Sequence, residues 1–282
     1  MGANKQADLE CGSLVPPSSS DEVSLQNSKQ ARALQENQLV TEDLRVQVNG
    51  TEILKGIRLD ARRGEILSII GPAGAGKTTF LRCLNRMAEL DLDFEISGKI
   101  LLDGQSIYDR DVAMLRRQVG MVFSVPVPLP MTVKENLTFG LRLASGSRSD
   151  DDERIEKALR AAYLWDEMKD RLNEPARNLS GGQQQRLCLA RSLALEPRVL
   201  LLDEPCSGLD PISTARIEEA LRGLKSNLAI ILVTNNVKQA ARASDRTAFF
   251  LFGELIELEP IEILFTTPRD QRTADYITGR FG

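Results

Sequence analysis

The chain has 282 residues, of which 42% are hydrophobic and 27% are charged, and these proportions are ordinary for a globular protein. Its formal net charge of −4 gives no general attraction to nucleic acid or anionic lipid, so any bound phosphate must be held by local geometry. The sequence has no histidine, which excludes histidine-based catalysis and histidine metal ligands, and no apolar run long enough for a membrane-spanning helix.

The first part of the chain differs in composition from the rest. Residues 1–36 are rich in serine, glutamine and asparagine, and they lack the apolar core of a signal peptide. We predict a disordered leader there and a protein that stays in the cytoplasm. The four cysteines are far apart in the sequence, which favours reduced thiols over a structural zinc site.

Several segments have the composition of β-strands. Residues 39–48 and 52–61 alternate between apolar and polar side chains, and Asn49-Gly50 between them is a strong hairpin-turn signal. The run at 64–70 is almost entirely apolar, as in a strand buried on both faces. Further strand candidates lie at residues 98–104, 119–123, 198–204, 228–234 and 247–253.

The middle of the chain changes to a helical period. Apolar residues such as Ile155 and Leu159 recur at helical spacing between residues 149 and 172, after an acidic run at 150–153 that suits a helix N-terminus. We therefore predict a mainly helical lobe over about residues 125–182. The simplest fold is a parallel α/β core interrupted by this helical insertion.

The segment GPAGAGKTT (71–79) matches the phosphate-binding pattern G-x-x-x-x-G-K-[ST]. It follows a predicted strand and precedes the helical run FLRCLNRMAEL, the context in which this pattern forms a phosphate loop. Backbone N–H groups would enclose phosphate oxygens, Lys77 would reach the β- and γ-phosphates, and Thr78 would ligate Mg²⁺. The predicted nucleotide contacts are Gly71, Pro72, Ala73, Gly74, Ala75, Gly76, Lys77, Thr78 and Thr79.

An acidic pair follows another buried strand. In RVLLLDEP, the strand would deliver Asp203 and Glu204 to the edge of the sheet where the phosphate loop lies. Asp203 is then the candidate that holds Mg²⁺ through water, and Glu204 is the candidate that orients or deprotonates the attacking water. Together with the phosphate loop, this pair predicts binding of ATP or GTP.

A second phosphate-binding helix end is predicted at LSGGQQQR (179–186). Ser180 occupies the helix-cap position, and Gly181 and Gly182 would let backbone amides approach an anion closely. An ordinary serine-capped helix would explain the serine but not the two consecutive glycines. Residues 180–183, which end with Gln183, are called the signature loop below.

The motifs together resemble the ATP-binding subunits of ABC transporters. GPAGAGKTT, LSGGQ, LLLDEP and SGLD occur in the family's order, and the stretches NRMAEL, VGMVF with PVPLPMTVKEN, LLLDEPCSGLDPIST and DYITGRFG are most similar to the phosphate-import (Pst-type) subunit. The resemblance covers about residues 38–282. It implies an α/β fold, a RecA-like P-loop NTPase core with an N-terminal antiparallel β subdomain and an inserted helical subdomain, as one ABC-type ATP-binding domain over residues 37–282.

The resemblance also implies partners and a reaction. Two chains would form a head-to-tail homodimer, with ATP and Mg²⁺ between the phosphate loop of one subunit and the signature loop of the other. Asp210 in SGLD would signal across the dimer. Two membrane-spanning permease subunits would bind near residues 124–131 at the cytoplasmic face of the inner membrane. ATP hydrolysis would then drive import of inorganic phosphate delivered by an extracytoplasmic phosphate-binding protein, and no nucleic acid would take part.

Three positions depart from the residues usual in the family. Ser124 replaces a glutamine that contacts Mg²⁺ and the attacking water, and its shorter side chain could reach only through a water; Gln118, six residues earlier on the same predicted strand, is too distant to substitute. The early hairpin has no aromatic residue to stack on adenine, so Val48 is the predicted base contact. Asn235 replaces a histidine that contacts the γ-phosphate, and its amide can donate a hydrogen bond but cannot carry a proton.

These departures leave three functions open. Retention of Glu204, Asp203, Lys77 and Thr78 favours a working ATPase, with Glu204 as base and Asn235 as a partial replacement for the histidine. A slow or regulatory nucleotide-binding subunit is the alternative, because a homodimer would carry the departures in both sites. A soluble ABC-type ATPase without a membrane partner is a third, although the acidic net charge argues against action on DNA.

Overall fold

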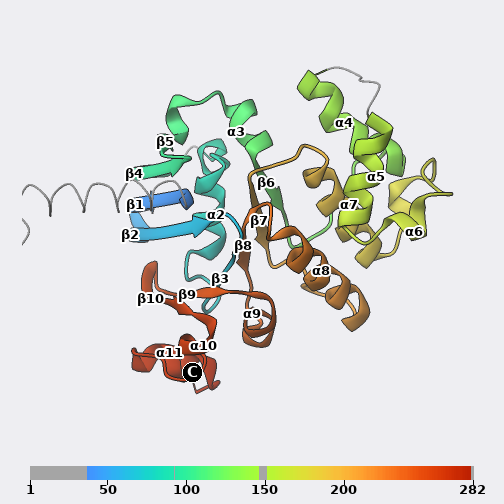
Figure 1. Ribbon diagram of the computed structural model, residues 1–282. Helices are drawn as coiled ribbons and strands as arrows, with labels where there is room; N and C mark the ends of the chain where they lie inside the picture. Colours follow the sequence, from blue (N-terminus) through green and yellow to red (C-terminus); the bar gives the residue numbers. More distant parts are fainter. Residues whose placement is uncertain (1–36, 92, 146–150, 281–282) are drawn as a thin grey trace, which may run out of the picture.

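The computed structural model describes residues 37–91, 93–145 and 151–280. The leader predicted for residues 1–36 and the first acidic residue of the run at 150–153 lie outside the described residues. The described chain forms two sheets with helices around them, and the helices α4, α5 and α6 lie on the side away from the antiparallel sheet (Figure 1). No helix among the described residues is long and apolar enough to span a membrane.

The antiparallel sheet comes from the start of the described chain. Its order is β2-β1-β4-β5, and the strands are β1 (Asn37–Val48), β2 (Thr51–Arg62), β4 (Phe94–Leu102) and β5 (Gln105–Ser106). The hairpin predicted at Asn49-Gly50 is confirmed, because both residues have positive φ, at 50° and 76°, as a two-residue turn with right-handed strand twist requires. Apolar side chains of this sheet, such as Leu44 and Leu54, pack into the main hydrophobic core.

The second sheet is mostly parallel and has the order β10-β9-β3-β8-β7-β6. Its strands are β3 (Ile66–Ile70), β6 (Val119–Val122), β7 (Val199–Asp203), β8 (Ala229–Val233), β9 (Arg246–Leu251) and β10 (Glu254–Pro260). Every residue of β3, β7 and β8 is buried, which confirms the prediction made from the apolar run at 64–70. These three strands are parallel neighbours, so their carboxyl ends meet at one edge. Strand β10 runs antiparallel and was not predicted.

Helices cover this sheet on both sides. They are α2 (Lys77–Leu84), α3 (Val112–Gln118), α4 (Val133–Ser145), α5 (Asp151–Ala161), α6 (Trp165–Met168), α7 (Gly181–Leu193), α8 (Pro211–Leu224), α9 (Val237–Ala243), α10 (Ile261–Leu264) and α11 (Gln271–Ile277), with 3₁₀ turns η1 (Ala88–Leu90), η2 (Ile107–Asp109) and η3 (Ala176–Asn178). The placement of Gln118 on a strand was wrong: it is the last residue of α3, and Arg110 Nη1 donates to its side-chain oxygen at 2.8 Å.

The helical lobe has its own core. Ile155 and Leu159 are fully buried among residues of α7 and the sheet, as their helical spacing predicted. The helical period between 149 and 172 belongs to two helices, because Tyr163 has φ of +53° and interrupts the chain between α5 and α6. Helices α4, α5 and α6 all fall inside the range 125–182.

Candidate functional site

The phosphate loop joins β3 to α2 and is held tightly by its neighbours. Gly71 has φ of +149°, and a Cβ there would lie 2.1 Å from the Phe250 carbonyl oxygen. Gly76 has φ of +92°, and a Cβ there would lie 2.7 Å from a methyl group of Leu54. Both glycines are therefore required by backbone conformation and packing as well as by close approach of a phosphate.

Lys77 is folded onto the loop that precedes it. Its ammonium donates hydrogen bonds to the carbonyl oxygens of Gly71 at 2.7 Å and Pro72 at 2.8 Å. Burial lowers the pKa of Lys77, and the charges of Glu204 and Asp203 oppose that shift. The cation is thus available beside the loop, satisfied by neutral carbonyls that a phosphate can replace.

Thr78 and Asp203 meet although they are 125 residues apart. The Thr78 hydroxyl lies 3.1 and 2.9 Å from the two carboxylate oxygens of Asp203, the last residue of β7. Burial raises the pKa of Asp203, whereas the hydrogen bond from Thr78 and the charge of Lys77 lower it. A hydroxyl and a carboxylate at this spacing supply the hard oxygen atoms that Mg²⁺ prefers, so these residues fit the predicted metal role.

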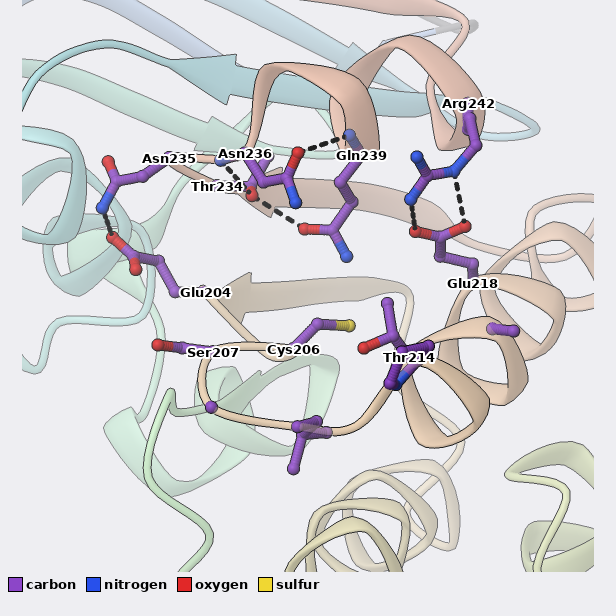
Figure 2. Close-up of a pocket in the computed structure, with 14 residues that line it drawn as sticks. Glu204, Cys206, Ser207, Thr214, Glu218, Thr234, Asn235, Asn236, Gln239 and Arg242 are labelled. Carbon is purple, nitrogen blue, oxygen red and sulfur yellow. Dashed lines mark hydrogen bonds and ion pairs between the residues drawn. The ribbon is translucent and has the colours of Figure 1, made fainter.

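Glu204 and Asn235 face each other across the ends of β7 and β8 (Figure 2). Glu204 has φ of +47°, an uncommon conformation for a residue with a side chain, and its amide donates to the Val233 carbonyl at 2.9 Å. The Asn235 amide nitrogen donates to a carboxylate oxygen of Glu204. The next residue, Asn236, has a different role, since its side chain caps α9 by accepting from the Gln239 amide at 3.1 Å.

These groups border a cavity of about 410 Å³. It is lined by Ile53, Ala73, Gly74, Ala75, Gly76, Lys77, Thr78, Thr79, Glu204 and Asn235. Ile53 was not predicted from the sequence, whereas the predicted base contact Val48 and the predicted metal contact Ser124 are not among these lining residues. Ile53 lies just after the hairpin turn. Its carbonyl oxygen lies 3.1 Å from where a Cβ of Gly76 would be.

Glu204 and Asn235 also line one end of a second cavity, of about 710 Å³ (Figure 2). It extends past Cys206 and Thr214 towards α8 and α9. Burial raises the pKa of the Cys206 thiol to about 11, so the thiol stays protonated at neutral pH. The described cysteines, Cys83, Cys188 and Cys206, are all free, as predicted.

The signature loop forms a capped helix start. The Ser180 hydroxyl accepts from the Gln183 amide at 3.3 Å, and the Gln183 side chain accepts from the Ser180 amide at 3.0 Å, which together form a capping box. A Cβ on Gly182 would lie 2.1 Å from the Ser213 hydroxyl oxygen, and that hydroxyl donates to Asp210 at 2.6 Å. The signature loop and Asp210 are therefore packed together within one chain, and none of these residues lines the cavity at the phosphate loop.

Glu167 of α6 joins the lobe to the signature helix and was not recognised in the sequence. Its carboxylate accepts hydrogen bonds from Gln183 at 2.8 Å and Arg186 at 2.8 Å, and it also pairs with Arg216 of α8. Burial acts to raise the pKa of Glu167, but the hydrogen bonds from Arg186 and Gln183 outweigh it and leave the pKa below its ordinary value. In the sequence, Glu167 is one acidic residue of a helix, and this does not indicate that it contacts residues of α7 and α8.

Ser124 lies in the segment that follows β6, at the border between the sheet and the helical lobe. The preceding residue, Phe123, has its carbonyl bound by the side-chain amide of Gln185 in α7 at 2.8 Å. The segment after Ser124 presents Val125 and Val127, which are 68% and 61% exposed. The structure therefore links the Ser124 segment to the signature helix, and Ser124 is not among the residues that line the phosphate-loop cavity.

Comparisons with known proteins agree with this arrangement. Residues 54–207 match the family model described as ABC transporter. One similar solved structure is cbiO1 from Clostridium perfringens, described as part of the ABC transporter complex cbiONQ; it is 28% identical over 87% of this chain and 97% of its own, with a TM-score of 0.72. Another is a bacterial Atm1-family ABC exporter with ATP bound, 26% identical over 88% of this chain and 42% of its own, with a TM-score of 0.73. The chain therefore belongs to the ABC transporter family and has the α/β fold of its ATP-binding domain.

Proposed function

We propose that this chain is the ATP-binding and ATP-hydrolysing subunit of an ABC importer, and that the imported substrate is inorganic phosphate. The observation that carries hydrolysis is that Lys77, Thr78 and Glu204 line one cavity, while Asp203 accepts a hydrogen bond from Thr78. Phosphoryl transfer to water needs a cation for the phosphates, oxygen ligands for Mg²⁺ and a carboxylate beside the attacking water.

Each side chain has a role in this proposal. Lys77 exchanges the Gly71 and Pro72 carbonyls for phosphate oxygens, and Thr78 with Asp203 holds the Mg²⁺ that neutralises phosphate charge. Glu204 orients or deprotonates the water, and Asn235 holds its carboxylate and donates towards the γ-phosphate. The Lys77 contacts are made within the chain, so nucleotide binding requires Lys77 to change partners, whereas Asn235 can keep Glu204 and donate its second amide hydrogen.

A head-to-tail homodimer accounts for the second phosphate-binding helix end. The signature loop presents the N-terminus of α7, yet none of its residues lines the cavity at the phosphate loop of the same chain. In the proposed dimer, the signature loop of one subunit completes the ATP site of the other. Asp210, tied to Gly182 through Ser213, would move with that signature loop and report its position.

Two permease subunits are the proposed membrane partners, bound at the cytoplasmic face. The segment 124–131 supports this assignment, because Val125 and Val127 expose apolar side chains and a carbonyl at its start is bound to the signature helix through Gln185. Movement of the signature helix would therefore be transmitted to this surface. Phosphate as substrate is supported by the stretches NRMAEL, PVPLPMTVKEN and DYITGRFG, which resemble the phosphate-import subunit, and an extracytoplasmic phosphate-binding protein completes the assembly.

A nucleotide-binding subunit with slow or no hydrolysis is a second candidate. The observation that favours it is the hydrogen bond from Asn235 to Glu204, which occupies the proposed base. An ABC-type ATPase that acts without a membrane partner is a third candidate, and it would bind nucleic acid instead of permease subunits.

The test is ATPase activity and partner capture in the assembled transporter. The complex with its permease subunits is placed in proteoliposomes with the binding protein, and we expect phosphate to stimulate ATP hydrolysis whereas sulfate does not. Equal hydrolysis by the wild type and Glu204→Gln would instead establish the regulatory candidate. Stimulation by another solute would correct the substrate, and purification with nucleic acid but without membrane subunits would establish the third candidate.

A further inference from the structure

The carboxylate of Glu167, in α6, is bound from two other helices, α7 and α8 (Figure 1). Arg186 of α7 donates to both of its oxygens, at 2.8 and 3.3 Å, and Arg216 of α8 pairs with it as well. The Arg186 side chain is only 3% exposed, so its charge needs a partner within the protein. These two arginines therefore hold the Glu167 carboxylate in one place beside the signature helix.

The same carboxylate holds the side chain of Gln183 in the signature loop. Gln183 Nε2 donates to Glu167 Oε2 at 2.8 Å, while Gln183 Oε1 accepts from the Ser180 amide at 3.0 Å. An ionised carboxylate only accepts hydrogen bonds, so Glu167 determines which end of the Gln183 amide faces it and which end faces Ser180. The Gln183 side chain is thus engaged at both ends within its own chain.

The donors that this arrangement leaves at the signature loop suit an anion. The Ser180 hydroxyl accepts from the Gln183 amide at 3.3 Å and keeps its own hydrogen. Gly181 and Gly182 begin α7, where backbone N–H groups have no partner within the helix. Because Gln183 binds the Ser180 backbone and side chain together, the position of the Gln183 side chain sets the direction of these donors.

We propose that Glu167 is a positioning residue that orients the signature loop, through Gln183, towards the ATP bound by the partner subunit. The inference rests on the proposed function in that the signature loop completes the ATP site of a second copy of this chain. Donors already held in their working direction need no reorganisation when charge develops on the phosphate. Glu167 is not among the residues that line the phosphate-loop cavity of its own chain, so its effect should fall on hydrolysis in the dimer.

A purely structural role for Glu167 makes a different prediction. The carboxylate would then only join α6 to α7 and α8, and its loss would lower the Tm without changing the kcat of the folded protein. Glu167→Gln separates the two roles, because glutamine keeps the shape but presents an NH₂ group to neighbours that are themselves donors. Glu156→Gln is the matched control, since Glu156 lies in the same lobe and pairs with Arg160 of its own helix.

The experiment measures three quantities on the full chain: the Kd of Mg²⁺-ATP, the kcat of hydrolysis and the Tm. Kd is measured with a fluorescent ATP analogue at a concentration where light scattering shows a monomer. The kcat is measured where the rate per chain no longer rises with chain concentration, well below the Tm of every variant. We expect Glu167→Gln to lower kcat about two- to tenfold, the range for one lost hydrogen bond, with Kd within about twofold. Glu156→Gln should match the wild type in both.

A double variant tests the route through Gln183. Gln183→Leu removes the amide that Glu167 binds, so adding Glu167→Gln to Gln183→Leu should lower kcat by less than Glu167→Gln does in the wild type. Multiplied losses, in which each substitution has its full effect in the presence of the other, would show that Glu167 acts independently of Gln183 and would overturn the inference.

The remaining outcomes separate this inference from the proposed function. Equal kcat values for Glu167→Gln and Glu156→Gln, with or without a lower Tm, mean that Glu167 is only structural, and the proposed function stands. A rise in the monomer Kd that accounts for the lost activity also overturns the inference, because the effect would then arise at the phosphate loop of the same chain. A wild type that neither dimerises with ATP nor hydrolyses it overturns the proposed function, and the inference with it.

Discussion

The edge of the parallel sheet and the signature loop both contain groups suited to phosphate, but they are built differently. At the sheet edge, Lys77, Thr78 and Glu204 line one cavity within a single chain, and Asp203 is hydrogen-bonded to Thr78. At the signature loop, Ser180 caps its own helix and borders no phosphate-loop cavity. In the proposed dimer, the sheet edge determines chemistry and nucleotide affinity, whereas the signature loop acts on the ATP site of the second subunit.

The largest expected effect is at the sheet edge. Glu204→Gln should lower kcat by at least about a hundredfold, because general-base catalysis contributes ~10²–10⁴ in rate, while Mg²⁺-ATP binding is retained. Steady-state phosphate release and nucleotide titration measure the two properties. Glu219→Gln, on the exposed face of α8, is the control and should behave as the wild type. A fall smaller than about threefold would show that Glu204 is not the base.

Asn235→His tests whether the partner of Glu204 limits the rate. We expect kcat to rise by about tenfold, less than the ~10²–10³ associated with complete loss of a transition-state donor, because asparagine already supplies one hydrogen bond. An imidazole also titrates near pH 6.5, so kcat should acquire a pH dependence between about pH 6 and 8 that the wild type lacks.

The control for Asn235→His lies at the other end of the same strand. Asn227 is exposed and precedes β8, whereas Asn235 follows it. Asn227→His adds an imidazole at the opposite end of β8 and should leave both kcat and its pH profile unchanged. If Asn235→His behaves like this control, position 235 does not limit hydrolysis.

The sheet edge could be predicted more completely than the signature loop, and the reason is physical. A buried apolar run fixes a strand, and parallel strands deliver their following residues to a common edge, so Lys77, Asp203 and Glu204 follow from local sequence. The contact between Gly182 and Ser213 depends on how α7 and α8 pack, which no short motif encodes. The Glu167 junction depends on that packing in the same way.

The base contact at the sheet edge is hard to predict for the same reason. Val48 and Ile53 flank one hairpin turn, and both are apolar, so the sequence alone does not distinguish which one faces the loop. In the structure Ile53 of β2 lines the cavity, and its carbonyl oxygen lies close to Gly76 of the phosphate loop. Tyr276 of the last helix stacks on Phe249 of β9, which is likewise a product of tertiary packing.

Gly182→Ala tests the packing of the signature loop against α8. A Cβ there would lie 2.1 Å from Oγ and 2.6 Å from Cβ of Ser213, so the helices must separate. Overpacking of this kind costs about 1–3 kcal/mol in the free energy of unfolding, which a lower Tm or urea midpoint would record. Gly181→Ala is the matched control, since its Cβ would meet Leu209 at 4.0 Å, an ordinary contact. Equal Tm values for the two variants would contradict this packing.

The smallest expected effect concerns pH and the Glu167 junction. Because hydrogen bonds from Arg186 and Gln183 hold the pKa of Glu167 below its ordinary value of 4.5, the ionised carboxylate stabilises the folded state above that value. This stabilisation should be lost as the pH falls below about 4.5 and through the lowered pKa of the folded state. Glu167→Gln should therefore lower the free energy of unfolding at pH 7 and have a smaller effect at pH 3.

Urea unfolding of the wild type and Glu167→Gln at both pH values measures that difference. Glu156→Gln is a suitable control, because Glu156 pairs with Arg160 on the exposed face of α5, where both side chains are about half exposed. Surface pairs contribute little, so this variant should change stability by less than about 1 kcal/mol at either pH. If Glu167→Gln matches it, the link between the lobe and the signature helix does not depend on the Glu167 charge. The helical lobe would then hold the signature loop through its apolar core alone.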